Sequence, residues 1–334
     1  MLTGAEGLLD LLLAVFPEEP PPKPFNLLWA TALISKHGVE LPEAARRAKV
    51  LPRRLTSVLE AQDLLVASLG SSLPALESDL ETRTRQSLGQ LVIGSLAERA
   101  FEEIYRESIG TTELELRDDR GSRGETDYLV FNGQGRQVFR INIKFHGALF
   151  RRANELVGLD PEDCFALATY KIHAALGRQD AEHLPYIFVI VGFRGLTGLS
   201  VGESIPEDVI HLAALSRILK TGGIRQFEDR IVDLLTARPD NFGLASAIKT
   251  YFHQIKGAAW FVLSARRADK LLRENLYDRV FALRVPRFTM NYRAAEVDMH
   301  FSLAQDLTPL TDFLALLRDH GMPGLVGRLE RGTV

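Results

Sequence analysis

The feature that most constrains the fold is an uninterrupted apolar run, YIFVIVGF, at residues 186 to 193. A strand with one wet face alternates polar and apolar side chains, whereas a strand that is buried on both faces is apolar throughout. The run is far shorter than the roughly 20 residues that a membrane-spanning helix needs. We therefore predict that it forms an inner strand of a sheet that is covered by helices.

The residues before this run indicate a helix, an antiparallel meander and a crossover helix, in that order. A strong helical pattern covers residues 88 to 108, and a further helical region is expected at about 149 to 178. The glycines of NGQG, at 132 to 135, suit a tight turn between two strands, because glycine adopts positive φ readily. Strands are expected at 112 to 116, 126 to 131 and 137 to 146. This order predicts an α/β sandwich core.

The chain is expected to divide into three consecutive parts, since 334 residues exceed the usual size of one domain. Residues 1 to 85 are predicted to form a helical domain, residues 86 to 200 the α/β core, and residues 201 to 334 a partly basic α/β extension. In the last part, helices are expected near 206 to 220, 223 to 237 and 243 to 255, and strands in AAWFVLS, DRVFALRV and AAEVDMHFSL.

Composition excludes several classes of protein. The single cysteine, Cys164, excludes internal disulfides and cysteine-cluster zinc sites, and it fits a reducing compartment. The N-terminal residues include Glu6 and Asp10 where a signal peptide has basic residues, so a cytoplasmic protein without membrane contact is expected. No P-loop, serine-hydrolase elbow or HExxH motif is present, which leaves nucleotide hydrolysis, serine esterase chemistry and zinc proteolysis without support.

Basic residues are concentrated in two segments, although the net charge is −3. Residues 41 to 60 contain five basic and two acidic residues, and residues 261 to 293 contain eight basic and three acidic ones. Local basic surfaces of this kind bind a phosphate backbone whatever the total charge. Solvated helix faces are the alternative explanation for each segment.

The first basic segment fits a helix-turn-helix template. Such a unit needs a small residue in its first helix and apolar residues at the turn and along its second helix, and Ala45, Val50, Leu55 and Val58 fall at those places. Lys49 stands where glycine is usual, so two packed amphipathic helices without DNA remain an alternative. The expected DNA-binding residues here are Arg46, Arg47, Lys49, Arg53 and Arg54.

A polar face is predicted on the strand at 137 to 146, where Arg140, Asn142 and Lys144 alternate with apolar residues. An ordinary half-exposed strand would give the same alternation. However, Asp127 opens the neighbouring strand of the hairpin, so its carboxylate and the Lys144 amine can face one pocket. Phosphodiester hydrolysis needs such a combination: a carboxylate that binds a divalent metal and a cation beside the attacking water.

With these residues and this order of elements, the region from about 86 to 195 resembles the PD-(D/E)XK nuclease superfamily. The resemblance implies that Asp127 binds metal, that Lys144 is the motif lysine and that Ile143 offers its backbone carbonyl to the metal. Asn142 occupies the usual acidic slot, so another acid is expected to replace that charge. Glu98, on the preceding helix, is favoured slightly over Glu155, which follows the lysine. Lys171, on the crossover helix, is a candidate phosphate contact.

The resemblance implies a restriction-endonuclease-like mixed sheet and an Mg²⁺-dependent endonuclease, with Mn²⁺ as a substitute metal. Double-stranded DNA is the expected substrate, in a restriction or anti-phage role, and a homodimer is expected because two strands must be cut. The alternative is a DNA-binding regulator or defence-complex subunit with a catalytically impaired nuclease fold. An RNA-processing nuclease is disfavoured, since no RNA-recognition motif is present.

Overall fold

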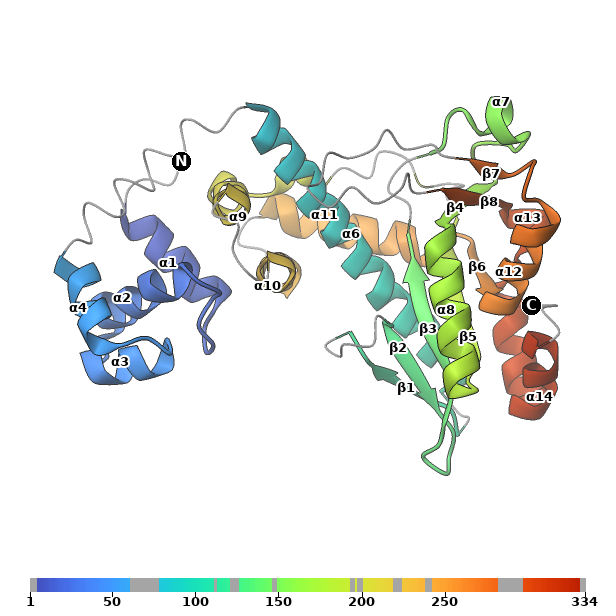
Figure 1. The fold of residues 1–334 in the computed structure, drawn as a ribbon, viewed down its shortest axis with the longest axis horizontal. Helices are drawn as coiled ribbons and strands as arrows, with labels where there is room; N and C mark the ends of the chain where they lie inside the picture. Colours follow the sequence, from blue (N-terminus) through green and yellow to red (C-terminus); the bar gives the residue numbers. More distant parts are fainter. Residues whose placement is uncertain are drawn as a thin grey trace. The chain divides into compact units, whose positions relative to one another are not determined.

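The computed structural model describes residues 5–60, 78–110, 113–120, 126–145, 149–192, 196, 201–218, 224–237, 242–281 and 297–330 (Figure 1). The chain divides into two compact units. The helical unit comprises Met1–Ser95 and Ser200–Thr250, and the sheet unit comprises Leu96–Leu199 and Tyr251–Val334. The chain therefore passes from one unit to the other at 95/96, at 199/200 and at 250/251.

This division differs from the expected domains at 1–85, 86–200 and 201–334, because helices after residue 201 complete the N-terminal core instead of extending the sheet. Phe227 lies in ring contact with Phe16 and with Phe25, at 5.2 Å between ring centroids in both cases. Trp29 is fully buried, and its Nε1 donates to the Phe16 carbonyl at 2.7 Å. Each segment thus buries the apolar face of the other.

The helical unit contains short helices from two stretches of the chain. They are α1 (Ala5–Val15), α2 (Phe25–His37), α3 (Leu41–Arg47), α4 (Pro52–Glu60), η1 (Gly202–Ser204), α9 (Glu207–Ile218) and α10 (Ile224–Ala237). The helices α6 (Ser78–Ile109) and α11 (Phe242–Lys256) begin in this unit and end in the sheet unit. Gly89 lets α6 approach the backbone of Gly202, since a Cβ at Gly89 would lie 3.1 Å from the Gly202 nitrogen.

The sheet unit is built on a six-stranded mixed sheet with strand order β1-β2-β3-β5-β6-β9. The strands are β1 (Glu115–Asp118), β2 (Tyr128–Phe131), β3 (Gln137–Lys144), β5 (Tyr186–Val191), β6 (Trp260–Ser264) and β9 (Thr308–Pro309). The first three form the expected antiparallel meander, and β5 runs parallel to β3. All six residues of β5 are buried, which confirms the prediction from the apolar run. The fold is therefore α/β, with helices on both faces of a mixed sheet.

Different helices cover the two faces of this sheet. On one face, α8 (Thr169–Glu182) and α12 (Ala265–Glu274) share a core with Phe188 and Ile190 of β5. On the other face, Phe101 of α6 is in ring contact with Tyr128 and Trp260. The C-terminal helix α14 (Leu310–Glu330) adds Phe313, whose ring meets that of Phe139 edge to face.

One sequence-based prediction is wrong in this unit: residues 149 to 178 are not one helical region. They form α7 (Ala153–Val157), the strand β4 (Cys164–Ala168) and the start of α8. β4 belongs to a second, antiparallel sheet with order β4-β8-β7, which also contains β8 (Asp298–Ser302) and β7 (Val280–Phe281). Pairing with β8, about 130 residues away in sequence, outweighs local helix propensity. A short helix, α13 (Leu303–Asp306), follows β8 directly. No helix in the described ranges is long and apolar enough to cross a membrane.

Candidate active site and nucleic-acid interface

The β2–β3 hairpin brings Asp127 to the polar triplet at the end of β3. The Asp127 amide donates to the Ile141 carbonyl at 3.1 Å, and its carboxylate Oδ2 accepts from the Ile143 amide at 2.5 Å. Both bonds fix the aspartate beside the C-terminal end of β3, where Lys144 is the last residue of the strand. The predicted proximity of Asp127 and Lys144 therefore follows from the register of the hairpin.

The Lys144 amine is held by its own strand. Its Nζ donates to the side-chain oxygen of Asn142 and to the Ile143 carbonyl, the second bond at 3.3 Å. Asn142 is buried, with 6% of its surface exposed. An amide oxygen can accept from the amine as a carboxylate does, but it adds no negative charge. The site consequently has one charge fewer than a triplet with an acid in this position.

Glu98 is the glutamate that lies near Asp127. Its backbone carbonyl accepts from the Tyr128 hydroxyl at 3.1 Å, which fixes this turn of α6 over the start of β2. Burial, and after it the negative charge of Asp127, raise the pKa of Glu98 from 4.5 to about 7, against the opposing effect of Arg120. Two carboxyl groups that repel each other in this way fit a divalent cation, which relieves the repulsion.

Glu155 lies elsewhere in the sheet unit. It is on α7, its side chain is 64% exposed, and it accepts two bonds from Arg152 at 2.7 and 2.9 Å. This pairing lowers the pKa of Glu155, with no contribution from Asp127. Of the two candidates, the structure thus brings Glu98 to the aspartate. Across the described residues, no group of three or more His, Cys, Asp and Glu side chains is arranged to hold a metal ion.

The sequence reasoning missed Arg120, which stands beside Glu98. Arg120 donates from Nη1 to Glu98 Oε2 at 2.9 Å and from Nε to Asp118 Oδ1 at 2.9 Å, and its guanidinium lies 5.6 Å from the centre of the Tyr128 ring. The signal was the run Asp118-Asp119-Arg120, which begins at the last residue of a strand. A second arginine near the site, Arg140 on the polar face of β3, forms ion pairs with Asp119 and Glu182, so its charge is already neutralised.

The helix-turn-helix candidate forms two helices, α3 and α4, with the turn that the template requires. Lys49 adopts the left-handed conformation, with φ of 55°, that glycine usually supplies. The turn is closed by a bond of 3.0 Å from the Val50 amide to the Ala45 carbonyl. Ala45 and Leu55 are fully buried at the helix crossing, whereas Val50 and Val58 are half-buried. The lysine at the glycine position therefore does not prevent the turn.

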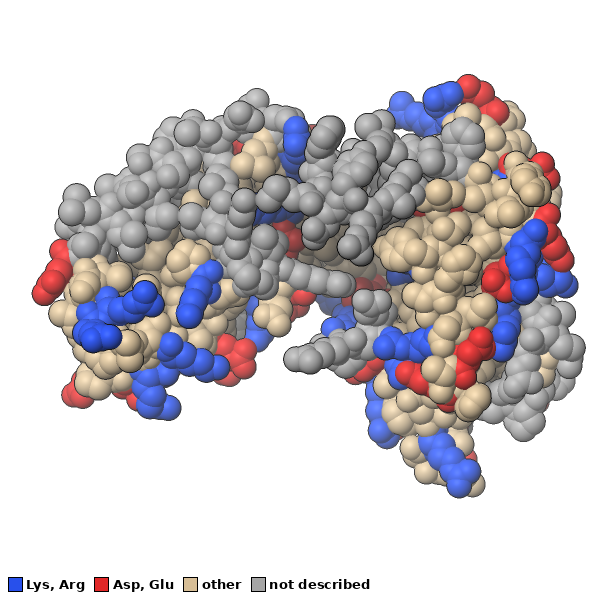
Figure 2. All heavy atoms as spheres, in the orientation of Figure 1, with Lys and Arg blue, Asp and Glu red and all other residues tan. Residues whose placement is uncertain are grey.

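The predicted DNA-binding residues differ in their availability. Arg53 and Arg54 are exposed, and no carboxylate within the described ranges pairs with either. Arg46 is paired with Glu43, and the Arg47 guanidinium lies 5.3 Å from the centre of the Trp29 ring. Figure 2 shows Lys and Arg side chains gathered over the region of α2 to α4.

The other expected phosphate contacts lie in the sheet unit. Lys171 is exposed on the first turn of α8, beside the Tyr170 ring at 5.9 Å. In the second basic segment, Arg266, Arg273 and Arg279 are paired with Asp180, Asp269 and Asp306, respectively. These pairs reduce the capacity of the described part of that segment to bind a phosphate backbone. Arg284, Arg287 and Arg293 lie outside the described residues.

Comparison of the chain with family models, with curated protein sequences and with solved structures gave no match. Any function assigned to the chain therefore depends on the residues and geometry above.

Proposed function

We propose that the chain is a metal-dependent endonuclease that cleaves phosphodiester bonds of double-stranded DNA. The observation that supports this proposal is that the Asp127 carboxylate, fixed at the end of the strand that bears Lys144, is near enough to Glu98 for its charge to raise the pKa of that glutamate. The element order around them resembles that of the PD-(D/E)XK core, with α6, the meander β1-β2-β3, the crossover helix α8, and β5 parallel to β3, although α7 and β4 intervene before α8.

Glu98, Asp127 and the Ile143 carbonyl would hold Mg²⁺, for which Mn²⁺ can substitute, because all three provide hard oxygen donors. When bound, the metal supplies positive charge that favours hydroxide over water and offsets the charge that develops on the phosphate. Asn142 adds at most a neutral oxygen. Lys144 contributes a second positive charge, at an amine that Asn142 and Ile143 hold in place.

The expected substrate follows from the second feature, the helix-turn-helix unit. Its second helix, α4, would enter a major groove, with Arg53 and Arg54 in its first turn. Cleavage of both strands requires two active sites, which favours a homodimer. A restriction or anti-phage role fits an enzyme that combines duplex recognition with cleavage.

The test is cleavage of supercoiled plasmid with Mg²⁺ or with EDTA. Asp127→Asn and Lys144→Ala should each lower the cleavage rate by on the order of 10²-fold or more, because the first removes a charged ligand of the metal and the second removes a positive charge that stabilises the transition state. Glu155→Gln is the matched control and should cut like the wild type, since Glu155 is exposed on α7. Normal cleavage by the Asp127 variant would refute the assignment of the site.

The second candidate function is that of a DNA-binding regulator or defence-complex subunit with an impaired site. The amide of Asn142 in the acidic slot, together with the Arg120 guanidinium on Glu98, favours it. Duplex binding without cleavage in Mg²⁺ and Mn²⁺ would support this candidate over the nuclease.

A further inference from the structure

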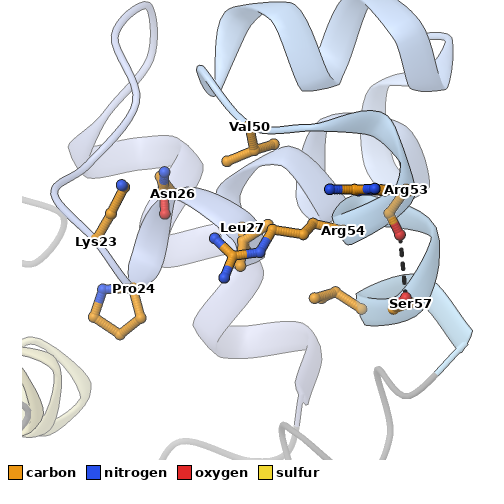
Figure 3. Close-up of a pocket in the computed structure, with 9 residues that line it drawn as sticks. Lys23, Pro24, Asn26, Leu27, Val50, Arg53, Arg54 and Ser57 are labelled. Atoms are coloured by element: carbon orange, nitrogen blue, oxygen red, sulfur yellow. Dashed lines mark hydrogen bonds between the residues drawn. The ribbon is translucent and has the colours of Figure 1, made fainter.

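A pocket opens beside the helix-turn-helix unit, between the start of α2 and α4 (Figure 3). Its volume is about 640 Å³. Lys23 and Asn26 line it from the side of α2, and Arg53 and Arg54 line it from α4. Figure 3 shows the Arg54 side chain extending from α4 across Leu27, towards the side on which Lys23 lies. The pocket is therefore bounded by cationic side chains from two separate parts of the chain.

The charge of this pocket favours an anion. Its lining contains Lys23, Arg53 and Arg54 and no carboxylate, and none of the three has an ion-pair partner among the residues that the structure describes. The pocket also lies at the starts of α2 and α4, and neither helix has an acidic residue in its first turn. Helix starts have partial positive charge from the aligned peptide dipoles, which adds to that of the side chains.

The pocket is larger than a single phosphate needs, and part of its wall is apolar. Leu27, Val50 and Val58 contribute that part of the lining. A volume of about 640 Å³ is within the range of roughly 300 to 1,000 Å³ that holds small organic ligands, so it can receive a phosphate with the sugar attached to it. The ligand that fits both the charge and the apolar wall is a sugar–phosphate unit.

The pocket is also linked to the turn of the helix-turn-helix unit. Asn26, which lines it, is buried, and its Nδ2 donates to the Ala48 carbonyl at 3.2 Å. Ala48 directly precedes Lys49, the left-handed residue of the turn. One residue thus lines the pocket and holds the end of α3 in place, so the pocket and α4 are fixed relative to each other within the helical unit.

We infer that this pocket binds the sugar–phosphate backbone of the same duplex that α4 enters, and that Lys23 is a phosphate contact outside the helix-turn-helix unit. The inference rests on the proposed DNA binding and extends its interface to the start of α2. Phosphate contacts fix the position of a recognition helix on the duplex without reading its sequence. Lys23 and Arg54 would hold one backbone while the exposed face of α4 meets the base edges.

The experiment measures binding of the full chain, in EDTA, to a duplex of roughly two helical turns over a series of salt concentrations. The slope of log K against log[salt] is negative, and each lost phosphate contact lowers its magnitude by about 0.9. Lys23→Ala should lower the slope by about that amount on several unrelated duplexes, and Arg53→Ala with Arg54→Ala by about twice as much. Lys36→Ala is the control, because Lys36 already pairs with Asp10 at 3.1 Å, and its slope should not change.

Three other results would overturn the inference in distinguishable ways. An unchanged slope for Lys23→Ala, with a lowered slope for the double arginine variant, would remove Lys23 from the interface and leave the helix-turn-helix assignment intact. A wild-type chain that binds no duplex would refute the inference together with the proposed DNA binding. Binding of free nucleoside monophosphate to the wild type but not to Lys23→Ala, with no displacement of the duplex, would assign the pocket to a small phosphate ligand. Lys23 is exposed, so its variant is expected to fold.

Discussion

Glu98→Gln should abolish cleavage and nevertheless stabilise the sheet unit above neutral pH. The pKa of Glu98 is raised from 4.5 to about 7, first by burial and then by the charge of Asp127. Between these two values the folded chain keeps a proton that the unfolded chain has released. The free energy of unfolding therefore falls as the pH rises from 4.5 to about 7, and it stays low above that range. Glutamine has no charge to bury, so the variant avoids this loss.

The size of the effect follows from the pKa. A pKa elevation from 4.5 to about 7 corresponds to about 3 kcal/mol, at roughly 1.4 kcal/mol per pKa unit. The raised pKa already includes the opposing effect of Arg120, which the glutamine meets as the protonated carboxyl does. The net expectation is therefore a stabilisation of about 3 kcal/mol at pH 8. Near pH 4.5 the advantage should disappear, because the wild-type carboxyl is then protonated in the folded chain.

The assay is urea unfolding at pH 4.5 and pH 8 in EDTA, followed by tryptophan fluorescence. The chain has two tryptophans, Trp29 in the helical unit and Trp260 in the sheet unit. In a Trp29→Phe background, the signal reports on Trp260, whose ring contacts Phe101 on the same helix as Glu98. A variant that is equally destabilised at both pH values would show that Glu98 is ionised and acts as a structural partner of Arg120. That result would refute the reasoning.

Two further substitutions probe the site and the turn. Asn142→Asp should retain cleavage, and it should partly restore cleavage to the Glu98→Gln variant, because it returns a carboxylate to the neighbourhood of Lys144. The rate of plasmid cleavage measures both effects. Complete inactivity of the single Asn142→Asp variant would count against the proposed metal site. Lys49→Gly should raise the unfolding free energy of the helical unit by about 0.5 to 1 kcal/mol. Glycine relieves the strain of the left-handed conformation, which costs a lysine about 1 to 2 kcal/mol, and this relief exceeds the greater backbone entropy that glycine loses on folding. Trp29 fluorescence during urea unfolding reports the change, and a less stable variant would contradict the role of the turn.

The parts of the fold that the sequence predicted are those set by local pattern. The apolar run at β5 and the alternation along β3 identified an inner strand and a strand with a polar face, and NGQG marked the turn between β2 and β3. The strand β4 was missed because its five residues are stabilised by β8, from the far end of the chain. The same limit applies to Phe227, whose partners Phe16 and Phe25 lie about 200 residues earlier.

The candidate site was predictable in its hairpin but not in its second acid. The positions of Asp127 and Lys144 relative to each other are set by the register of two adjacent strands, and the spacing of residues in the sequence predicts that register. Glu98 and Glu155 are both helical glutamates near the hairpin in sequence, and the position of each helix in space decides between them. Arg120 could not be placed at all, because its position depends on how the chain leaves β1 and on the turn of α6 that it meets.

The chain crosses between its two units three times, and these crossings determine the order in which the two units can be completed during synthesis on a ribosome. The rings of Phe16 and Phe25 leave the ribosome about 200 residues before Phe227, an interval of roughly 10 to 40 s at typical synthesis rates. During that time β1, β2, β3 and β5 are made, but β6 follows only after the last helices of the helical unit. Neither unit can close its core before synthesis of the other has begun. Nascent chains should therefore expose apolar faces of both units at once, and they should depend on chaperones until β6 and α14 emerge.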